Sequence, residues 1–348
     1  MNFTNCSIYD KLDKSLFPCL YGILMIISIP ANLLSLYISC CQIQKKSELG
    51  IYLFCLSLAD LLYTMTLPLW IYYAQNGDDW KFSLQLCKLS AFLRYVNYYT
   101  SSGFLTCISM DRYLAIVHPL RFHSLRTRRF ALLMSFLVWV FEIMSNVQIL
   151  FNTEFYYKVA NESTHTLCYD TYPLQQWQAY FNYYRICVGY AFPLAVMIFC
   201  YVKIYQAVKH NQATQGCDKK KINHLLLSII ITFFLCFTPY HIVLLLRSIL
   251  ESPDCSYVNY LFVPYRITTA LTSLNCIADP ILYCFVNETG RADIWNIFKC
   301  GFFVSQTEAQ QSSVSQNRTK RFQNLQHSYN LRVSSLHLPS IAELHWEI

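Results

Sequence analysis

Long apolar runs separated by short polar segments dominate the pattern along the chain. Seven runs carry at most three charged residues each, and they cover residues 16–43, 49–73, 89–117, 130–151, 180–202, 222–246 and 261–286. A helix that crosses a bilayer needs about 20 apolar residues. The pattern therefore predicts an all-α membrane protein, with a seven-helix transmembrane bundle over residues 16–289.

Lysine and arginine indicate the orientation, because cytoplasmic loops of membrane proteins carry an excess of both. The loops after the first, third and fifth runs hold eleven of these residues, and the loops after the second, fourth and sixth runs hold four. We therefore expect a multi-pass plasma-membrane protein with its N-terminus outside the cell. The first run is too long for the apolar part of a signal peptide and lacks a cleavage motif, so we interpret it as a span.

Three flanking segments complete the expected organisation. They are an extracellular N-terminus over residues 1–15, a short amphipathic helix on the inner membrane surface over residues 290–303, and a disordered cytoplasmic tail over residues 304–348. Cys300 is a candidate for palmitoylation, with a free interfacial thiol as the alternative.

The expected outer side carries further modification sites. Glycosylation sequons there begin at Asn2, Asn5 and Asn161. Cys6 and Cys255 also lie outside and could form a disulfide, although Cys19 is a competing partner.

Composition narrows the class of protein. Hydrophobic residues make up 55% of the chain and charged residues 14%, whereas an ordinary soluble domain has about 25% charged residues. The sixteen cysteines lack the spacing of a zinc site, and no hydrolase or metalloprotease motif is present. We therefore expect neither an enzyme nor a bound cofactor, and nothing indicates a nucleic-acid partner.

Three carboxylates, Asp60, Glu142 and Asp279, lie within apolar runs. Such residues are costly inside a membrane and usually functional. Removing a carboxyl group from water favours its protonated form, and a neighbouring carboxylate favours that form further. These residues could therefore bind protons as a coupled set.

Two histidines, His165 and His241, are placed where extracellular protons can reach them, and histidine titrates in the physiological range. We expect His241 to face an outer cavity. Its protonation beside Arg266 or another cation would push helices apart, and the alternative is a neutral histidine hydrogen-bonded within the pocket. Most of the outer acids, among them Asp78, Asp79 and Glu251, are expected to form a solvated face.

Characteristic residues follow one another through the seven runs. They are Asn32, Leu-Ser-Leu-Ala-Asp60, Asp111-Arg112-Tyr113, Trp139, Pro193, Cys236-Phe-Thr-Pro239 and Asp279-Pro-Ile-Leu-Tyr283. With these motifs, residues 16–303 resemble the rhodopsin-like (class A) G-protein-coupled receptors. Residues 48–54, 125–132, 265–274 and 287–291, together with Glu142 and His241, are most similar to the proton-sensing receptors of that class.

The resemblance implies a function and partners. Extracellular protons are the implied agonist, and a heterotrimeric G protein, of the stimulatory type that raises cyclic AMP, is the implied effector. Arrestin and receptor kinases at the tail and membrane lipids are further implied partners. Protonation of Asp60, Glu142 and Asp279 is implied to favour the active packing of the helices.

The resemblance also implies roles for single residues. Arg112 pairs with Asp111 at rest and meets the G protein on activation. The other residues implied in activation and coupling are Tyr113, Tyr201, Pro239, Pro280 and Tyr283.

Two structural features follow from the same resemblance. Cys87 and Cys168 match the disulfide between the third span and the second outer loop. Asp60 and Asp279 match a structural sodium site together with Ser101 and Asn275, and that site is the alternative to a proton-sensing role.

Two other functions are compatible with carboxylates inside the membrane. A proton-coupled transporter is expected to show an internal repeat and discontinuous helices, and the sequence shows neither. A lysolipid or peptide receptor of the same fold is the closer alternative. Its pocket candidates are Arg94, Tyr98, Arg185 and Arg266, whose arginines could hold an anionic head group.

Overall fold

The computed structural model describes residues 13–119, 121–122, 126–151, 156–160, 163–169, 171–210, 216–251 and 255–282, all of which belong to one compact unit. Several predicted features lie outside these residues. They are the sequons at Asn2, Asn5 and Asn161, Cys6, Tyr283, the amphipathic segment with Cys300, and the tail.

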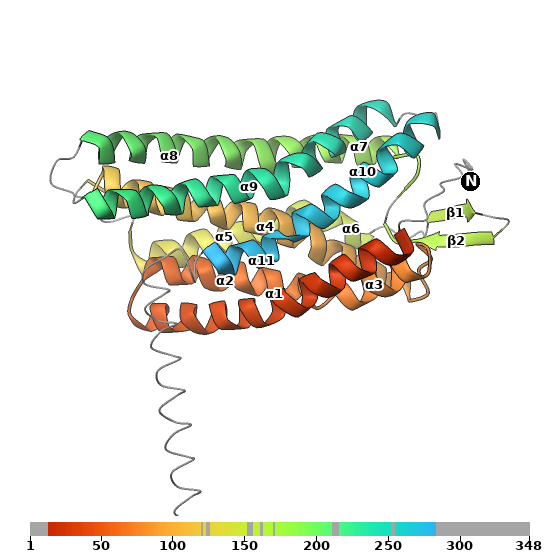
Figure 1. Ribbon diagram of the computed structural model, residues 1–348, viewed down its shortest axis with the longest axis horizontal. Coiled ribbons are helices and arrows are strands. Elements are labelled where there is room, and N and C mark those ends of the chain that lie inside the picture. The colour runs from red at the N-terminus through yellow and green to blue at the C-terminus, as the bar shows by residue number, and fades with distance from the viewer. Residues whose placement is uncertain are drawn as a thin grey trace, which may run out of the picture. The chain divides into compact units, whose positions relative to one another are not determined.

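The described residues make seven helical passes, some of them built from two or three consecutive helices (Figure 1). In chain order the passes are α1 (Asp13–Gln44); α2 (Glu48–Thr64) with α3 (Leu67–Gln75); α4 (Leu84–Val117); α5 (Arg128–Asn146) with α6 (Gln148–Phe151); α7 (Gln176–Tyr184), the π-helix η2 (Arg185–Ala191) and α8 (Phe192–His210); α9 (Gly216–Leu250); and α10 (Cys255–Ser273) with α11 (Asn275–Ile281). The helical bundle predicted from the apolar runs is confirmed. In Figure 1 the starts of α1 and α10 lie at one end of these passes, and the end of α8 and the start of α9 lie at the other.

Within the described part of the chain, five of these passes are long and apolar enough to cross a membrane. The exceptions are α4 and the α10–α11 pass. Most residues of α4 between Cys87 and Asp111 are buried against other helices. A helix surrounded by protein needs no apolar lipid-facing surface, so its composition can be more polar than that of a peripheral helix.

The break between α2 and α3 follows from a proline. Pro68 occupies the first turn of α3, and the residue before a proline is disfavoured in helical conformation. Thr66, at the break, donates a side-chain hydrogen bond to the Tyr63 carbonyl at 2.7 Å. The second pass is therefore interrupted between α2 and α3, and the Tyr63 carbonyl still has a hydrogen-bond donor.

The π-helix in the fifth pass also has a proline beside it. Pro193 has no N–H group to offer the carbonyl of Gly189, four residues earlier. The Ser102 hydroxyl of α4 donates to that oxygen at 2.9 Å. The irregular turn thereby brings the third and fifth passes into direct polar contact.

A short hairpin, which the sequence did not predict, joins the fourth and fifth passes. Strands β1 (Tyr156–Ala160) and β2 (Ser163–Leu167) pair antiparallel, with Lys158 opposite His165. The hairpin lies at the same end as the starts of α1 and α10 (Figure 1). The disulfide between Cys87 at the start of α4 and Cys168 directly after β2 anchors it, which confirms the pairing implied by resemblance.

Removing this disulfide is expected to destabilise the protein. The bond closes a loop with a sequence separation of 81, and a cross-link of this kind stabilises by about 2–4 kcal/mol. Cys87→Ser and Cys87→Ser/Cys168→Ser should therefore both lower the thermal unfolding midpoint of the detergent-solubilised protein. Cys187→Ser, which removes an exposed free thiol, is the control, and an unchanged midpoint in the disulfide variants would contradict the prediction.

Candidate functional site

Two carboxylates face each other in the centre of the bundle. Asp60 of α2 is 0% exposed and Asp279 of α11 is 1% exposed, and they lie close enough for their charges to repel. The Asn97 amide of α4 donates to Asp60 Oδ1 at 2.8 Å. Asp60 Oδ2 and both carboxylate oxygens of Asp279 have no hydrogen-bond partner within the described part of the chain.

Other polar atoms without a partner surround this acid pair. Ser101 Oγ and Asn275 Nδ2 are buried and, among the described residues, make no hydrogen bond. Buried polar atoms nearly always have a partner, so a group of orphans indicates room for water or an ion. The carboxylate and hydroxyl oxygens are ligands that a small hard cation prefers. Asp60, Asp279 and Ser101 therefore fit such an ion, whereas the unpartnered atom of Asn275 is an N–H donor that fits a water molecule.

The backbone and thiol of Cys276 connect the acid pair to its surroundings. Its Sγ lies 3.6 Å from Asn97 Oδ1 and 3.5 Å from Asn275 Oδ1, and its carbonyl accepts from Asn32 at 2.7 Å. The sequence analysis did not single out this cysteine. Only the position next to Asn275 could have indicated a polar role.

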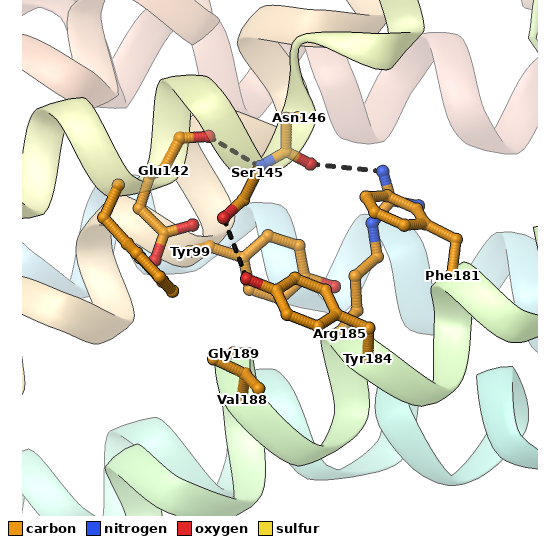
Figure 2. Close-up of a pocket in the computed structure, with 10 residues that line it drawn as sticks. Tyr99, Glu142, Ser145, Asn146, Phe181, Tyr184, Arg185, Val188 and Gly189 are labelled. Atoms are coloured by element: carbon orange, nitrogen blue, oxygen red, sulfur yellow. Dashed lines mark hydrogen bonds between the residues drawn. The ribbon is translucent and has the colours of Figure 1, made fainter.

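Glu142 lies in a separate cleft between the fourth and fifth passes (Figure 2). The free volume of the cleft is only about 10 Å³, and the cleft is lined by Tyr99, Phe141, Glu142, Ser145, Asn146, Phe181, Tyr184, Arg185, Val188 and Gly189. The Glu142 side chain is 8% exposed. Figure 2 shows Asn146 between Glu142 and Arg185, where its amide donates to the Glu142 carbonyl at 3.0 Å and accepts from Arg185 at 3.2 Å.

Arg185 is a buried cation surrounded by neutral groups. Its guanidinium lies 3.7 Å from the Tyr95 ring centroid and 4.3 Å from that of Phe181, and it donates to the Tyr169 hydroxyl at 3.4 Å. None of the described carboxylates lies within ion-pair distance of it. Aromatic faces and amide oxygens stabilise a guanidinium only in part, and Glu142, which lines the same cleft, carries the opposite charge when it is ionised.

His241 is packed between aromatic rings. Its side chain is 2% exposed, its ring stacks on Tyr190 at 4.4 Å, and its Nδ1 lies 2.8 Å from the Phe237 carbonyl. The prediction that His241 faces an outer cavity was wrong, because the sequence could not show that Tyr190 covers it. Of His165, the other predicted histidine, the structure describes only the backbone in β2.

The residues predicted to line a ligand pocket do not share one cavity. Arg94 covers the Trp70 ring at 3.3 Å, and Arg266 forms a 3.0 Å ion pair with Asp78. Tyr98 is fully buried. Only Arg185 of the four lines the cleft beside Glu142.

At the C-terminal end of α4, both oxygens of Asp111 have cationic partners. Arg112 Nη2 lies 2.6 Å from Oδ2, as the resemblance implied, and Arg126 Nε lies 3.5 Å from Oδ1. Sequence reasoning missed Arg126 because the contact spans a loop. The Tyr113 hydroxyl lies 3.1 Å from His118 Nε2.

The other residues that the resemblance implies in activation and coupling lie apart from the Asp111–Arg112 pair. Tyr201 of α8 stacks on Tyr205. Pro239 lies within α9 and Pro280 within α11.

The chain is similar to known proteins over most of its length. Residues 31–283 match the model of the family described as 7 transmembrane receptor (rhodopsin family). The chain is 54% identical to human G-protein coupled receptor 65 over 310 residues, which are 86% of the chain and 91% of that protein. It is 41% identical to mouse G-protein coupled receptor 68, over 83% of the chain and 78% of that protein. It is 31% identical to chicken lysophosphatidic acid receptor 6, over 82% of the chain and 94% of that protein.

Proposed function

Since the chain belongs to the rhodopsin family of seven-transmembrane receptors, we propose that it is activated by extracellular acid and signals through the stimulatory G protein and cyclic AMP. The receptor is multi-pass, and its N-terminus lies outside the cell in this proposal. Arrestin and receptor kinases act at the tail, and a sodium ion occupies the acid pair at rest. Sodium and protons then favour opposite charge states of Asp60 and Asp279.

The observation that carries the proposal is the setting of the three membrane carboxylates. Asp60, Glu142 and Asp279 are each buried, and none of them forms an ion pair with a described cation. A buried carboxylate without a cation is costly in its charged form. Uptake of protons therefore changes the energy of the helix packing around these residues.

The direction of the response follows from linkage. Acid favours whichever conformation binds the titrating protons more tightly. The Asp111–Arg112 pair is intact in this structure. In the receptors that this chain resembles, an intact pair belongs to the resting arrangement. The active arrangement is therefore the one that better accommodates neutral carboxyl groups.

The test is cyclic AMP in transfected cells between about pH 8 and about pH 6, the range that brackets histidine titration. Wild type is expected to respond to acid without added ligand. Glu142→Gln imitates the protonated carboxyl, so its response should begin at higher pH. His241→Phe tests the alternative sensor, and a displaced response in that variant alone would assign sensing to the histidine.

A matched control is available at Glu48, at the cytoplasmic start of α2. Glu48→Gln removes a carboxylate that extracellular protons do not reach, so its pH midpoint should equal that of wild type. A flat wild-type curve in cyclic AMP, calcium and Rho readouts would overturn the proposal.

Arg185 supports a second candidate, a receptor for an anionic amphiphile. Phe141 and Tyr184 at the rim of its cleft are partly exposed on the surface of the bundle, where an acyl chain would lie in the bilayer. A response that requires added lysolipid at constant pH, and is lost in Arg185→Gln, would favour this function. A response to acid in lipid-depleted medium would favour proton sensing.

A further inference from the structure

Three buried hydroxyl groups from three passes meet at one point. Ser273 Oγ of α10 lies 2.8 Å from the Tyr63 hydroxyl of α2 and 2.9 Å from the Tyr98 hydroxyl of α4. The Thr269 carbonyl lies 3.1 Å from the Tyr98 and the Ser273 hydroxyls and can accept from either of them. The side chains of Tyr63, Tyr98 and Ser273 are 0% exposed. We call these three residues the hydroxyl cluster.

We propose that the hydroxyl cluster is a positioning site that holds the outer half of the seventh pass in the resting arrangement and so sets the external pH at which the receptor responds. This inference rests on the proposed proton-sensing function. The cluster itself takes up no proton. It acts through the acid pair below it.

Each member of the cluster is joined to the acid pair along its own helix. Tyr63 follows Asp60 by three residues, about one helical turn. Tyr98 follows Asn97, which donates to Asp60. Ser273 is the last residue of α10, and α11, which carries Asp279, begins two residues later at Asn275. A shift of either carboxylate therefore moves a neighbour of the cluster.

The seventh pass is interrupted where the cluster ends. Leu274 separates α10 from α11, and its N–H bonds to the Leu271 carbonyl in a tight turn instead of continuing the helix. The cluster anchors the part before this turn. The part after it is tied to the first pass, because the Cys276 carbonyl accepts from Asn32 and Ser28.

Because the hydroxyl cluster is buried, it strongly favours one packing arrangement of α2, α4 and α10. A buried hydroxyl that loses its partner costs more than an exposed one, because no water replaces the bond. Moving α10 away from α2 and α4 would break the bonds of both tyrosines to Ser273 together. The cluster therefore stabilises the arrangement seen here, in which the Asp111–Arg112 pair is intact.

The charged and titratable groups around the cluster and the acid pair come from several helices. Besides Asp60 and Asp279, they are Tyr21 of α1, Arg94 of α4, Cys236 of α9 and Cys276 of α11. Arg94 is the cation in this set, and its guanidinium lies over the Trp70 ring. The variants below leave all these groups in place, so any shift in the pH response comes from the lost hydroxyl.

The experiment compares Tyr63→Phe, Tyr98→Phe and Ser273→Ala with wild type over the pH series, at matched surface expression. The phenylalanine variants retain the edge-to-face ring pair of Tyr63 and Tyr98. Losing one buried hydrogen bond is expected to raise activity at alkaline pH about twofold to tenfold. The pH midpoint should move to higher pH, because less proton binding is needed to reach the active arrangement.

Tyr240→Phe is the matched control. Tyr240 is as deeply buried as the cluster and packs edge-to-face on Tyr98, but its hydroxyl has no hydrogen-bond partner among the described residues. Its midpoint should equal that of wild type. Ser273→Thr, which retains a hydroxyl, should restore most of the wild-type midpoint.

A double variant tests whether Ser273 is the shared partner. Tyr63→Phe/Ser273→Ala should shift the midpoint no further than Ser273→Ala alone, because both changes remove the same bond. Midpoints that stay at the wild-type value in a receptor that responds to acid would overturn this inference alone. A wild-type receptor without any acid response would overturn the proposed function instead.

Discussion

Replacing Glu251 with alanine is expected to destabilise the receptor by about 3–5 kcal/mol, because it would leave the charge of Arg247 buried and unpaired. The two residues form a bidentate pair, with Arg247 in the last turn of α9 and Glu251 directly after its end, and with Nε–Oε1 at 2.7 Å and Nη2–Oε2 at 2.8 Å. Their side chains are 2% and 0% exposed. The thermal unfolding midpoint of the detergent-solubilised receptor should fall sharply, and surface expression with it.

The same pair holds the segment after Cys168 against α9. Arg247 donates to the Thr171 carbonyl at 3.2 Å, and Glu251 accepts from the Leu174 N–H at 3.1 Å. Removing Glu251 therefore also leaves a backbone N–H without its partner, which adds to the cost. The C-terminal end of α9 should become more accessible to proteolysis as well.

Two controls separate this effect from a general loss of charge. Arg247→Met/Glu251→Leu removes both charges, and replacing a buried pair by apolar residues is often neutral or stabilising. This variant still leaves the Thr171 carbonyl and the Leu174 N–H without these partners, so its unfolding temperature should lie between those of Glu251→Ala and wild type. Lys81→Ala removes an exposed lysine whose partner Asp79 keeps its hydrogen bond from the Thr166 N–H, and it should cost less than about 1 kcal/mol. A Glu251→Ala receptor as stable as Lys81→Ala would contradict the prediction.

Glu251 also shows where sequence reasoning fails. The sequence predicted a solvated face for the outer acids, yet Glu251, Asp78 and Asp79 are all buried. Composition alone gives acidic residues in a loop a high chance of exposure. The partners that bury these three come from other elements: Arg247 one turn back, Arg266 of α10, and the Thr166 N–H of β2.

The features that sequence predicted well depend on local patterns. The seven passes follow from the length of the apolar runs, and the intramembrane positions of Asp60, Glu142 and Asp279 follow directly from those runs. The surroundings of Glu142 did not follow, because Arg185 comes from another pass and donates to Asn146, which lies one turn along α5 and donates to the Glu142 carbonyl. His241 was likewise placed on the correct helix but not in its aromatic surroundings.

Replacing Gly189 with alanine is expected to be as damaging as the loss of Glu251, for a steric reason. A Cβ atom at Gly189 would lie 2.4 Å from Cδ1 and 2.6 Å from Cε1 of Tyr99, well inside van der Waals contact. The Tyr99 ring is buried and lies edge-to-face against His241, so it has little room to swing aside. Moving η2 outward instead would stretch the hydrogen bond from Ser102 to the Gly189 carbonyl.

The expected loss exceeds about 3 kcal/mol, the upper end of the usual cost of overpacking a buried site. It is measured as the unfolding midpoint and as the fraction of receptor at the cell surface. Gly22→Ala is the matched control, because a Cβ there meets no atom within 4 Å and alanine favours a helix by up to about 1 kcal/mol over glycine.

A rescue experiment distinguishes this clash from a need for glycine flexibility. Tyr99→Val shortens the side chain that the new methyl group meets, so Tyr99→Val/Gly189→Ala should be more stable than Gly189→Ala alone, although Tyr99→Val by itself costs stability through the cavity it leaves. If the double variant is instead less stable than both single variants, the backbone of the π-helix needs glycine for its own geometry. In that case the close contact of Tyr99 with the fifth pass is not what makes Gly189 necessary.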